Sequence, residues 1–96
     1  MHVISKKPLE RFWTVHPRAR KPLETWLKRA RKAEWESFDA VRVDYPHADR
    51  YERFVIFDIG GNKYRLIATI HYNRRKVYVR HVLTHAEYTR GDWKNE

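Results

Sequence analysis

The stretch from Ile59 to Arg90 constrains the fold of this chain most. It holds most of the side chains that could do chemistry, and its pattern is that of paired strands. Residues 63–70 and 77–82 are rich in β-branched and aromatic types, whereas residues 73–76 between them are polar and mostly charged. This pattern predicts two strands joined by an exposed hairpin loop.

The register of the predicted hairpin decides which side chains share a face. An even-numbered loop pairs Tyr72 with Val77, which places Arg65 opposite Thr84. Successive side chains of a strand point to opposite faces. One face is then expected to face the core, with Tyr64, Leu66, Ala68, Ile70, Val77, Val79, His81 and Leu83. The other face predicts a surface that binds an anionic partner, with Arg65, Ile67, Thr69, His71, Tyr78, Arg80, Val82 and Thr84.

A third strand is predicted at residues 54–59, joined to the hairpin through Gly60 and Gly61. A Gly-Gly pair supplies the positive φ angles that primed two-residue turns require, so Ile59 is expected to face Asn62. Together the segments predict a three-stranded antiparallel meander with one apolar side and one basic side.

The N-terminal half predicts helices. Ser5 is expected to cap a first helix, and Pro22 is tolerated in the first turns of a second. Ser37 is expected to cap a short helix that Pro46 ends. The apolar residues at helical spacing in the first two helices are Leu9, Phe12, Trp13, Leu23, Trp26, Leu27 and Ala30.

The remaining segments complete the predicted fold. Residues 2–4 are expected to form a strand at the edge of the sheet, and residues 47–52 a polar connection. We therefore predict a single α+β domain over residues 1–96, with an N-terminal strand and two helices packed on the meander and a short C-terminal helix.

The charge of the chain favours a polyanionic partner. It has 21 Lys and Arg against 12 Asp and Glu, a formal net charge of +9, which is typical of nucleic-acid-binding domains. There is no Cys, so disulfides and thiolate metal sites are excluded, as suits a cytosolic protein. The N-terminus lacks the apolar stretch of a signal peptide, and no window is apolar enough to span a membrane.

The segment Thr84-His85-Ala86-Glu87 predicts a helix start. Thr84 and Glu87 fit a capping box, in which each side chain satisfies a free backbone N–H, so we assign them no catalytic role. His85 and Tyr88 then occupy the first and fourth helical positions. A helix N-terminus attracts phosphate and favours neutral imidazole, the form that can accept a proton. In the predicted register Arg65 reaches the same place, so a phosphate docked there is expected to meet a guanidinium, free N–H groups, an imidazole and a phenol.

This set matches the needs of RNA cleavage by the attached 2′-hydroxyl. A base takes the 2′-OH proton, an acid protonates the leaving 5′ oxygen, and a fixed cation stabilises the phosphorane. We predict catalytic roles for Arg65, His85 and Tyr88, with no metal and no cofactor, since the sequence has neither an HExxH motif nor a carboxylate cluster. The expected RNA-binding residues are Lys63, Thr69, His71, Arg74, Arg75, Tyr78 and Arg80. The other histidines are expected to lie in the core (His81) or on the surface (His2, His16 and His47).

Three blocks also resemble the HigB family of type II toxins: residues 57–67 (FDIGGNKYRLI), 77–80 (VYVR) and 83–88 (LTHAEY). The resemblance covers nearly the whole chain and implies a RelE-like fold. It also implies ribosome-dependent cleavage of mRNA in the ribosomal A site, the activity of an mRNA interferase. Such an enzyme is expected to work in the cytoplasm. The family resemblance further implies a cognate HigA-type antitoxin with a helix-turn-helix domain, through which alone the toxin would meet operator DNA.

The resemblance also implies roles for single residues. In the wider RelE-like superfamily an arginine on the second meander strand and a C-terminal tyrosine act in catalysis, and Arg65 and Tyr88 match those positions. Some relatives carry paired lysines on the preceding strand, where this chain has residues 54–57 (FVIF). This departure favours His85 as the general base.

Two other functions fit the sequence. A non-catalytic RNA-binding domain agrees with the charge and the aromatic residues, although no RRM, KH or cold-shock signature is present. A small interaction domain, such as an inactive toxin relative that binds only its antitoxin or DNA, is the third alternative. Incubation with ribosomes and a defined mRNA separates the nuclease from both.

Overall fold

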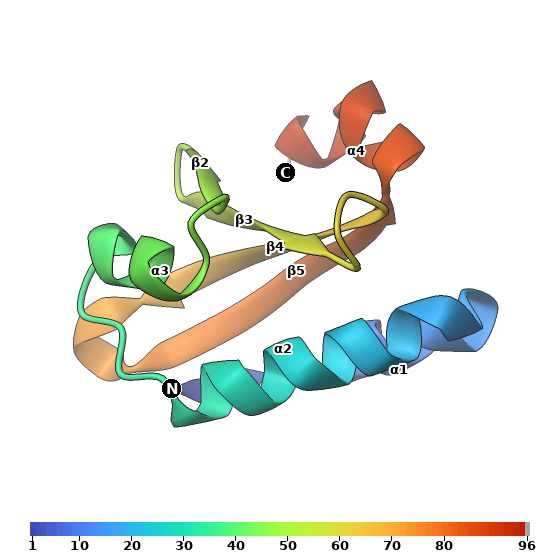
Figure 1. The fold of residues 1–96 in the computed structure, drawn as a ribbon. Coiled ribbons are helices and arrows are strands. Elements are labelled where there is room, and N and C mark those ends of the chain that lie inside the picture. The colour runs from blue at the N-terminus through green and yellow to red at the C-terminus, as the bar shows by residue number, and fades with distance from the viewer. Residues whose placement is uncertain (96) are drawn as a thin grey trace.

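A computed structural model describes residues 1–95, and it has a five-stranded sheet with helices on both faces (Figure 1). The strand order is β1-β5-β4-β3-β2, with β1 parallel to β5 and the other neighbours antiparallel. The strands are β1 (His2–Ile4), β2 (Asp49–Tyr51), β3 (Phe54–Ile59), β4 (Tyr64–His71) and β5 (Lys76–Thr84). The α-helices are α1 (Lys7–Val15), α2 (Arg20–Lys32), α3 (Phe38–Asp44) and α4 (His85–Arg90). The predicted α+β class is confirmed.

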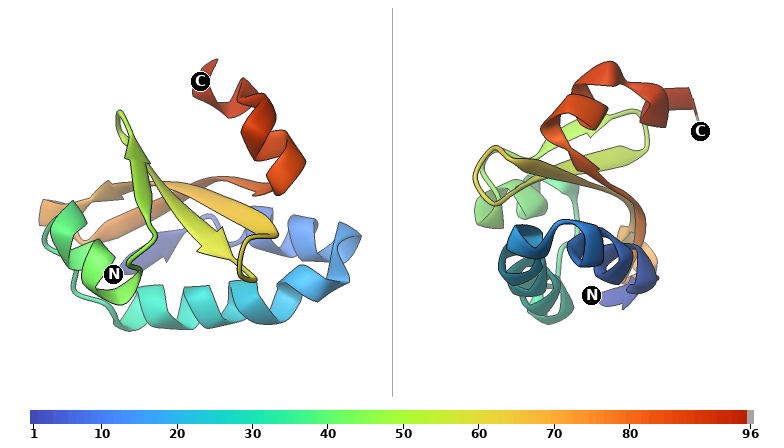
Figure 2. Two further views of the ribbon diagram at one scale, coloured as in Figure 1. Left: turned by 45° about the horizontal axis from the view of Figure 1, so that its top comes forward. Right: turned by 90° about the vertical axis from the view of Figure 1, so that its right-hand side faces the viewer.

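The main core lies between the sheet and the two long helices, which run along one face (Figures 1 and 2). The fully buried ring of Phe57 on β3 is its centre, because Trp26, Trp35 and Tyr45 all contact it with ring centroids 5.1 to 5.9 Å apart. Aromatic residues of this size bury large areas, which compensates for the short chain. The prediction that two helices pack on one face is confirmed.

A second, smaller core covers part of the opposite face of the sheet, under the C-terminal segment (Figure 2). Trp93 packs edge-on against Phe54, at 5.8 Å, and also contacts Ile56 and Ile67 in the same cluster. The prediction of an open basic surface along the whole of this face is therefore wrong. Apolar side chains at 54, 56 and 67 alternate with the polar ones, and a tryptophan beyond the short helix buries them.

The register of the β4–β5 hairpin differs from the predicted one at both ends. Near the loop Ile70, rather than Tyr72, pairs with Val77, because residues 72–74 form a 3-10 turn and Arg75 adopts a left-handed φ of 56°. The register shifts again between Ile67 and Ala68, and Arg65 therefore pairs with Leu83. The predicted pairing of Arg65 with Thr84 is wrong by one residue.

The second shift is a β-bulge that reverses the faces of the end of β5. Ile67 pairs with His81 and Ala68 with Val79, which leaves Arg80 as the extra residue. Val82 consequently packs on the main core, and Leu83 packs on the smaller one. The predicted core-face positions of His81 and Leu83 are wrong for this reason, as are the polar-face positions of Val82 and Thr84.

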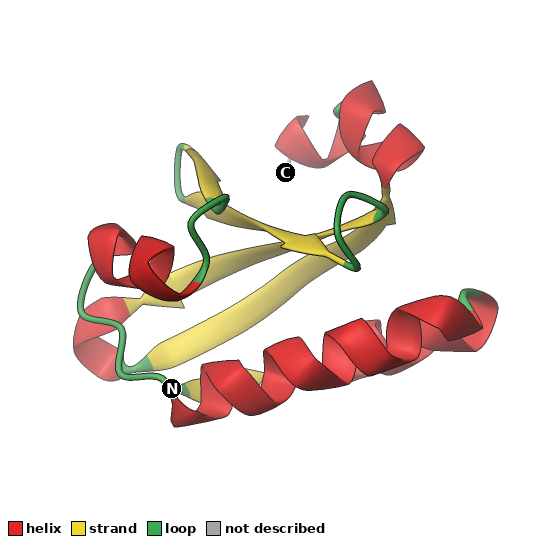
Figure 3. Cartoon of the chain, in the orientation of Figure 1, coloured by secondary structure: helices red, strands yellow, loops and turns green. Residues whose placement is uncertain are grey.

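Three further features differ from the prediction: the β3–β4 connection, the strand β2 and the start of α1 (Figure 3). Ile59 pairs with Tyr64, so the loop has four residues rather than two, although Gly60 and Gly61 both have the expected positive φ. The segment predicted as a polar connection contains the short exposed strand β2. The residue before α1 is Lys6, and Ser5 does not cap the helix. Ser37 does cap α3, since its Oγ accepts from the N–H of Ala40 at 3.2 Å.

Candidate active site

The start of α4 is fixed by the predicted capping box, which is confirmed. The Thr84 Oγ1 accepts from the backbone N–H of Glu87 at 3.2 Å, and Glu87 Oε1 accepts from the backbone N–H of Thr84 at 2.9 Å. The Thr84 backbone N–H holds the pKa of the Glu87 carboxyl below its usual value, since it stabilises the charged form. Gly91, with a φ of 82°, ends the helix. The cap thus fixes where His85 and Tyr88 lie relative to the sheet.

Arg65 is a buried arginine with four of its five N–H donors engaged. Only 7% of the residue is exposed. Its Nε lies 3.1 Å from Asp58 Oδ1, and its Nη1 donates to the backbone carbonyls of Asn62, at 3.3 Å, and Tyr64, at 3.1 Å. Its Nη2 donates to Asn62 Oδ1. The guanidinium is therefore held in one orientation between β3 and the β3–β4 loop.

The Tyr88 ring lies between Arg65 and Trp93, the tryptophan of the smaller core. Its ring lies 5.1 Å from the Arg65 guanidinium carbon and stacks on Trp93, with centroids 5.4 Å apart and planes inclined by 11°. Burial raises the pKa of the Tyr88 phenol; Asp49 adds to the rise and Arg65 opposes it. The phenol therefore holds its proton more tightly than the phenol of an exposed tyrosine does. The structure thus brings Arg65 and Tyr88 together.

His85 lies at the exposed first position of α4. Its Nδ1 is 3.4 Å from Thr89 Oγ1, and its backbone N–H donates to the Lys63 carbonyl at 3.1 Å. The N–H groups of His85 and Glu87 thus already have partners within the protein. The expectation that a phosphate would meet free N–H groups at this helix end is wrong for these two. The imidazole itself remains exposed to an incoming substrate.

Four of the predicted RNA-binding residues form one cluster on the uncovered part of the sheet. Arg80 Nε donates to Thr69 Oγ1 at 3.1 Å, and the Arg80 guanidinium carbon lies 5.2 Å from the Tyr78 ring. His71 packs edge-on against Tyr78 at 5.1 Å. This cluster of Thr69, His71, Tyr78 and Arg80 combines a cation with aromatic rings, as single-stranded nucleic acid binding requires.

The other predicted RNA-binding residues lie apart from this cluster, in the loops at the two ends of β4. Lys63 is exposed beside His85 in the β3–β4 loop. Arg74 and Arg75 are exposed in the β4–β5 connection, where Arg75 lies 3.7 Å from Glu34. These three side chains therefore lie at the two ends of β4 and are not part of the cluster on the sheet.

Sequence reasoning missed Asp58, Asn62 and Trp93. In the observed register of the β3–β4 hairpin, Asp58 pairs directly across from Arg65. The predicted register of this hairpin differs from the observed one by two residues, and it therefore did not place the two side chains together. The sequence did offer a sign of Trp93. The predicted C-terminal helix is too short to be stable alone and must pack on the sheet, and Trp93 is the large aromatic residue just beyond its end.

Residues 1–95 contain neither a metal-binding cluster nor a membrane-spanning helix. No cluster of three or more His, Asp or Glu side chains is placed to hold a metal ion within this part of the chain. The helices described there are all too short or too polar to cross a membrane.

Comparisons with known proteins identify the family of this chain. Residues 19–91 match the family model of the HigB toxin, described as a RelE-like toxic component of a toxin-antitoxin system. The mRNA interferase HigB of Escherichia coli strain CFT073 is 29% identical over 91 residues, which are 92% of this chain and 88% of the relative. The mRNA interferase toxin HigB of Escherichia coli K12 and the mRNA interferase HigB of Shigella flexneri are both 26% identical over the same shares. Because the family model covers most of the chain, this protein belongs to the HigB family of RelE-like toxins and has the fold of that family.

Proposed function

We propose that this protein is an endoribonuclease that inhibits translation by cleaving mRNA in the ribosomal A site, without a metal ion. The observation that carries the proposal is the contact between Arg65 and Tyr88 at the base of α4, one turn from His85, in a chain whose relatives are named mRNA interferases. The formal charge of +9 supports a polyanionic substrate.

The proposed reaction is an attack of the RNA 2′-oxygen on its neighbouring phosphorus. Neutral His85 takes the 2′-OH proton, and the new bond from the 2′ oxygen to phosphorus forms as the bond to the 5′ oxygen breaks. Tyr88 gives its phenolic proton to that leaving oxygen. Arg65 stabilises the phosphorane charge with a guanidinium that is already oriented by Asp58 and Asn62.

The cluster of Thr69, His71, Tyr78 and Arg80 would hold nucleotides beside the reacting one, with base stacking on Tyr78 and a phosphate on Arg80. A cluster of four side chains on an open surface orients a free RNA poorly. The ribosome is therefore expected to align the mRNA with the catalytic residues. Because it acts on translating ribosomes, we also propose that the protein works in the cytoplasm and that residues 1–96 act as one domain.

Cleavage should therefore depend on ribosomes. Labelled mRNA bound to programmed ribosomes should be cut within the A-site codon, and the same RNA free in solution should be cut far more slowly. Binding should weaken steeply with salt, because each phosphate contact releases condensed counterions. Efficient cutting of free RNA at low enzyme concentration would instead identify an independent ribonuclease, and no cutting at all would favour a non-catalytic RNA-binding protein.

A toxin of this family requires an antitoxin, and we propose a HigA-type partner with a helix-turn-helix domain that alone contacts operator DNA. The exposed basic cluster around Arg80 is the surface that an acidic or helical antitoxin segment would cover. Co-expression with the adjacent antitoxin gene should suppress growth inhibition and yield one stable complex. Separate elution of the two proteins at micromolar concentration would reject this pairing.

A further inference from the structure

Trp93, just beyond the end of α4, contacts Tyr88 in two ways. The two rings stack, with centroids 5.4 Å apart and planes inclined by 11°. The indole Nε1 of Trp93 also donates to the backbone carbonyl of Tyr88 at 3.1 Å. The stack fixes the plane of the Tyr88 ring, and the hydrogen bond fixes the backbone from which that ring projects. Together the two contacts restrict the Tyr88 side chain more than either does alone.

The turn after α4 brings Trp93 back to the helix. Gly91, whose left-handed φ ends α4, donates its N–H to the Tyr88 carbonyl at 3.1 Å, and the Lys94 N–H donates to the Gly91 carbonyl at 3.1 Å. The Tyr88 carbonyl therefore accepts from both the turn and the indole. A helix of six residues is too short to be stable alone, so tertiary contacts such as these must hold its side chains in place.

The sheet in turn holds Trp93. The residue is buried, and its ring packs edge-on against Phe54 of β3, at 5.8 Å, and against Tyr51 of β2, at 5.6 Å. The Lys94 ammonium lies 4.8 Å from the Tyr51 ring on the same side. An indole packed among the side chains of two strands has little freedom to rotate, so Trp93 fixes Tyr88 relative to the sheet.

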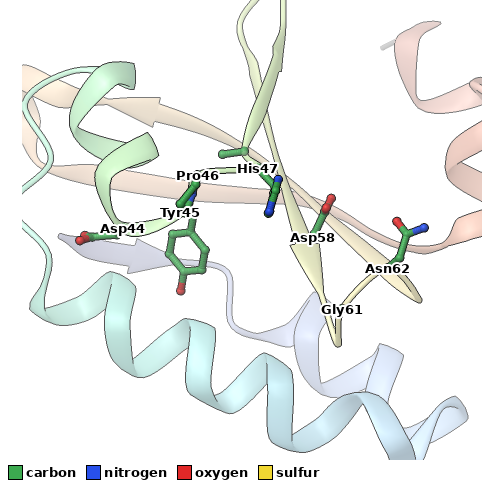
Figure 4. A pocket seen from close by; sticks show the side chains of 8 residues that line it. Asp44, Tyr45, Pro46, His47, Asp58, Gly61 and Asn62 are labelled. Carbon is green, nitrogen blue, oxygen red and sulfur yellow. The ribbon is translucent and has the colours of Figure 1, made fainter.

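Arg65 is held by a different set of contacts. Asp58 on β3 and Asn62 in the β3–β4 loop bond to its guanidinium, and in Figure 4 their side chains point away from α2. These bonds orient the guanidinium but not the Tyr88 ring, which lies 5.1 Å from the guanidinium carbon. The ring is therefore placed between Arg65, held by β3 and its loop, and Trp93, held by β3 and β2.

We infer that Trp93 is a positioning residue for mRNA cleavage, which acts by holding Tyr88 against Arg65; the inference rests on the proposed function. Trp93 keeps the phenol where the leaving 5′ oxygen takes its proton, beside the guanidinium that stabilises the phosphorane. Trp93 itself does not touch the reacting atoms in this role. Its loss should therefore leave the toxin able to bind its substrate but slow to cut it.

The test is Trp93→Phe, assayed by single-turnover cleavage of mRNA on programmed ribosomes at increasing toxin concentration. The variant keeps an aromatic ring at this position and loses the indole N–H. Its maximal rate should fall about tenfold, within the roughly 10²-fold that a misplacement of about 1 Å can cost. The toxin concentration that gives half the maximal rate should stay unchanged. An unchanged maximal rate, or a change in that concentration alone, would overturn the inference.

Trp35→Phe is the matched control for lost stability. Trp35 is also buried, and its indole N–H also donates, to Asp44 at 2.8 Å, but its ring stacks on Phe57 in the main core. Assayed below the melting temperatures of both variants, Trp35→Phe should cleave at the wild-type maximal rate. An equal fall in the two variants would show a general effect of stability and would overturn the inference. Trp93→Met, whose flexible side chain fills irregular space, serves with the same expected results if Trp93→Phe does not fold.

A double variant shows whether Trp93 acts through the Tyr88 hydroxyl. Tyr88→Phe removes that hydroxyl, so adding Trp93→Phe to it should slow cleavage little further. A purely structural role would instead slow cleavage by the same factor in both backgrounds, and that result would overturn the inference.

The contact itself is measured in the free protein, apart from catalysis. NOEs between the Tyr88 ring protons and the Arg65 side chain should be present in the wild type, weaken in Trp93→Phe and persist in Trp35→Phe. Full-strength NOEs in Trp93→Phe would overturn the inference whether or not the protein cuts RNA. Wild-type protein that cuts no mRNA on ribosomes would reject the proposed function, whereas a normal rate in Trp93→Phe would reject only the role of Trp93.

Discussion

Arg65→Ala should abolish growth inhibition and slow single-turnover mRNA cleavage by about 10²–10³-fold, the usual effect of removing one donor that stabilises transition-state charge. The variant should remain folded. Loss of the guanidinium leaves the Asp58 carboxylate without its ion pair, but 35% of the Asp58 side chain is exposed and water can solvate it. The checks are cleavage on programmed ribosomes and a thermal melt of the same preparation.

Two further variants show whether the guanidinium itself is needed. Arg65→Lys keeps the charge but cannot make the bidentate, planar set of contacts to Asp58 and Asn62, so it should recover little activity. Arg20→Ala, which removes an exposed arginine paired with Glu24 on α2, should cleave like the wild type. Full activity in a folded Arg65→Ala protein would remove the residue from the mechanism.

His85→Ala and His85→Gln should both slow cleavage by about 10²–10⁴-fold, the range for the loss of a general base. The side chain is exposed and its ring nitrogen lies within hydrogen-bond distance of Thr89 on the same helix, so stability should change little. Single-turnover rates on programmed ribosomes give the measurement. If His85→Gln cuts at nearly the wild-type rate, the histidine only holds RNA by a hydrogen bond.

Tyr88→Phe is the matched comparison. It keeps the ring that stacks on Trp93 and lies against Arg65, and it removes only the hydroxyl. Its rate should fall because the leaving oxygen loses its proton donor, whereas its stability should stay close to that of the wild type. An exposed histidine elsewhere, replaced in His2→Ala, should leave the rate unchanged.

The sequence predicted the elements of the fold other than the short strand β2, because local patterns determine them. Alternation defined the meander, helical spacing defined α1 and α2, and the Thr84–Glu87 pair marked the start of α4. Register was harder, since it depends on loops whose backbone the residue types do not determine. The 3-10 turn after His71 and the bulge at Arg80 each move the pairing, and the residue types there do not mark either feature.

The candidate site was predictable only in part for the same reason. Motif and charge identified Arg65, His85 and Tyr88, but the partners of Arg65 depend on a register that the sequence does not determine. Asp58 and Asn62 were therefore missed, although both bond to the guanidinium. The ring that lies against the Arg65 guanidinium belongs to Tyr88, which stacks on Trp93, and both are distant from Arg65 in sequence.

The chemistry of the cut ends tests the central claim most directly. mRNA cut on ribosomes by the wild-type protein should carry a 2′,3′-cyclic phosphate, or the monophosphate formed when it opens, on the upstream fragment and a 5′-hydroxyl on the downstream one. These ends follow from attack by the 2′ oxygen with loss of the 5′ oxygen. A 3′-hydroxyl with a 5′-phosphate would show that water attacks instead, and it would contradict the roles given to His85 and Tyr88.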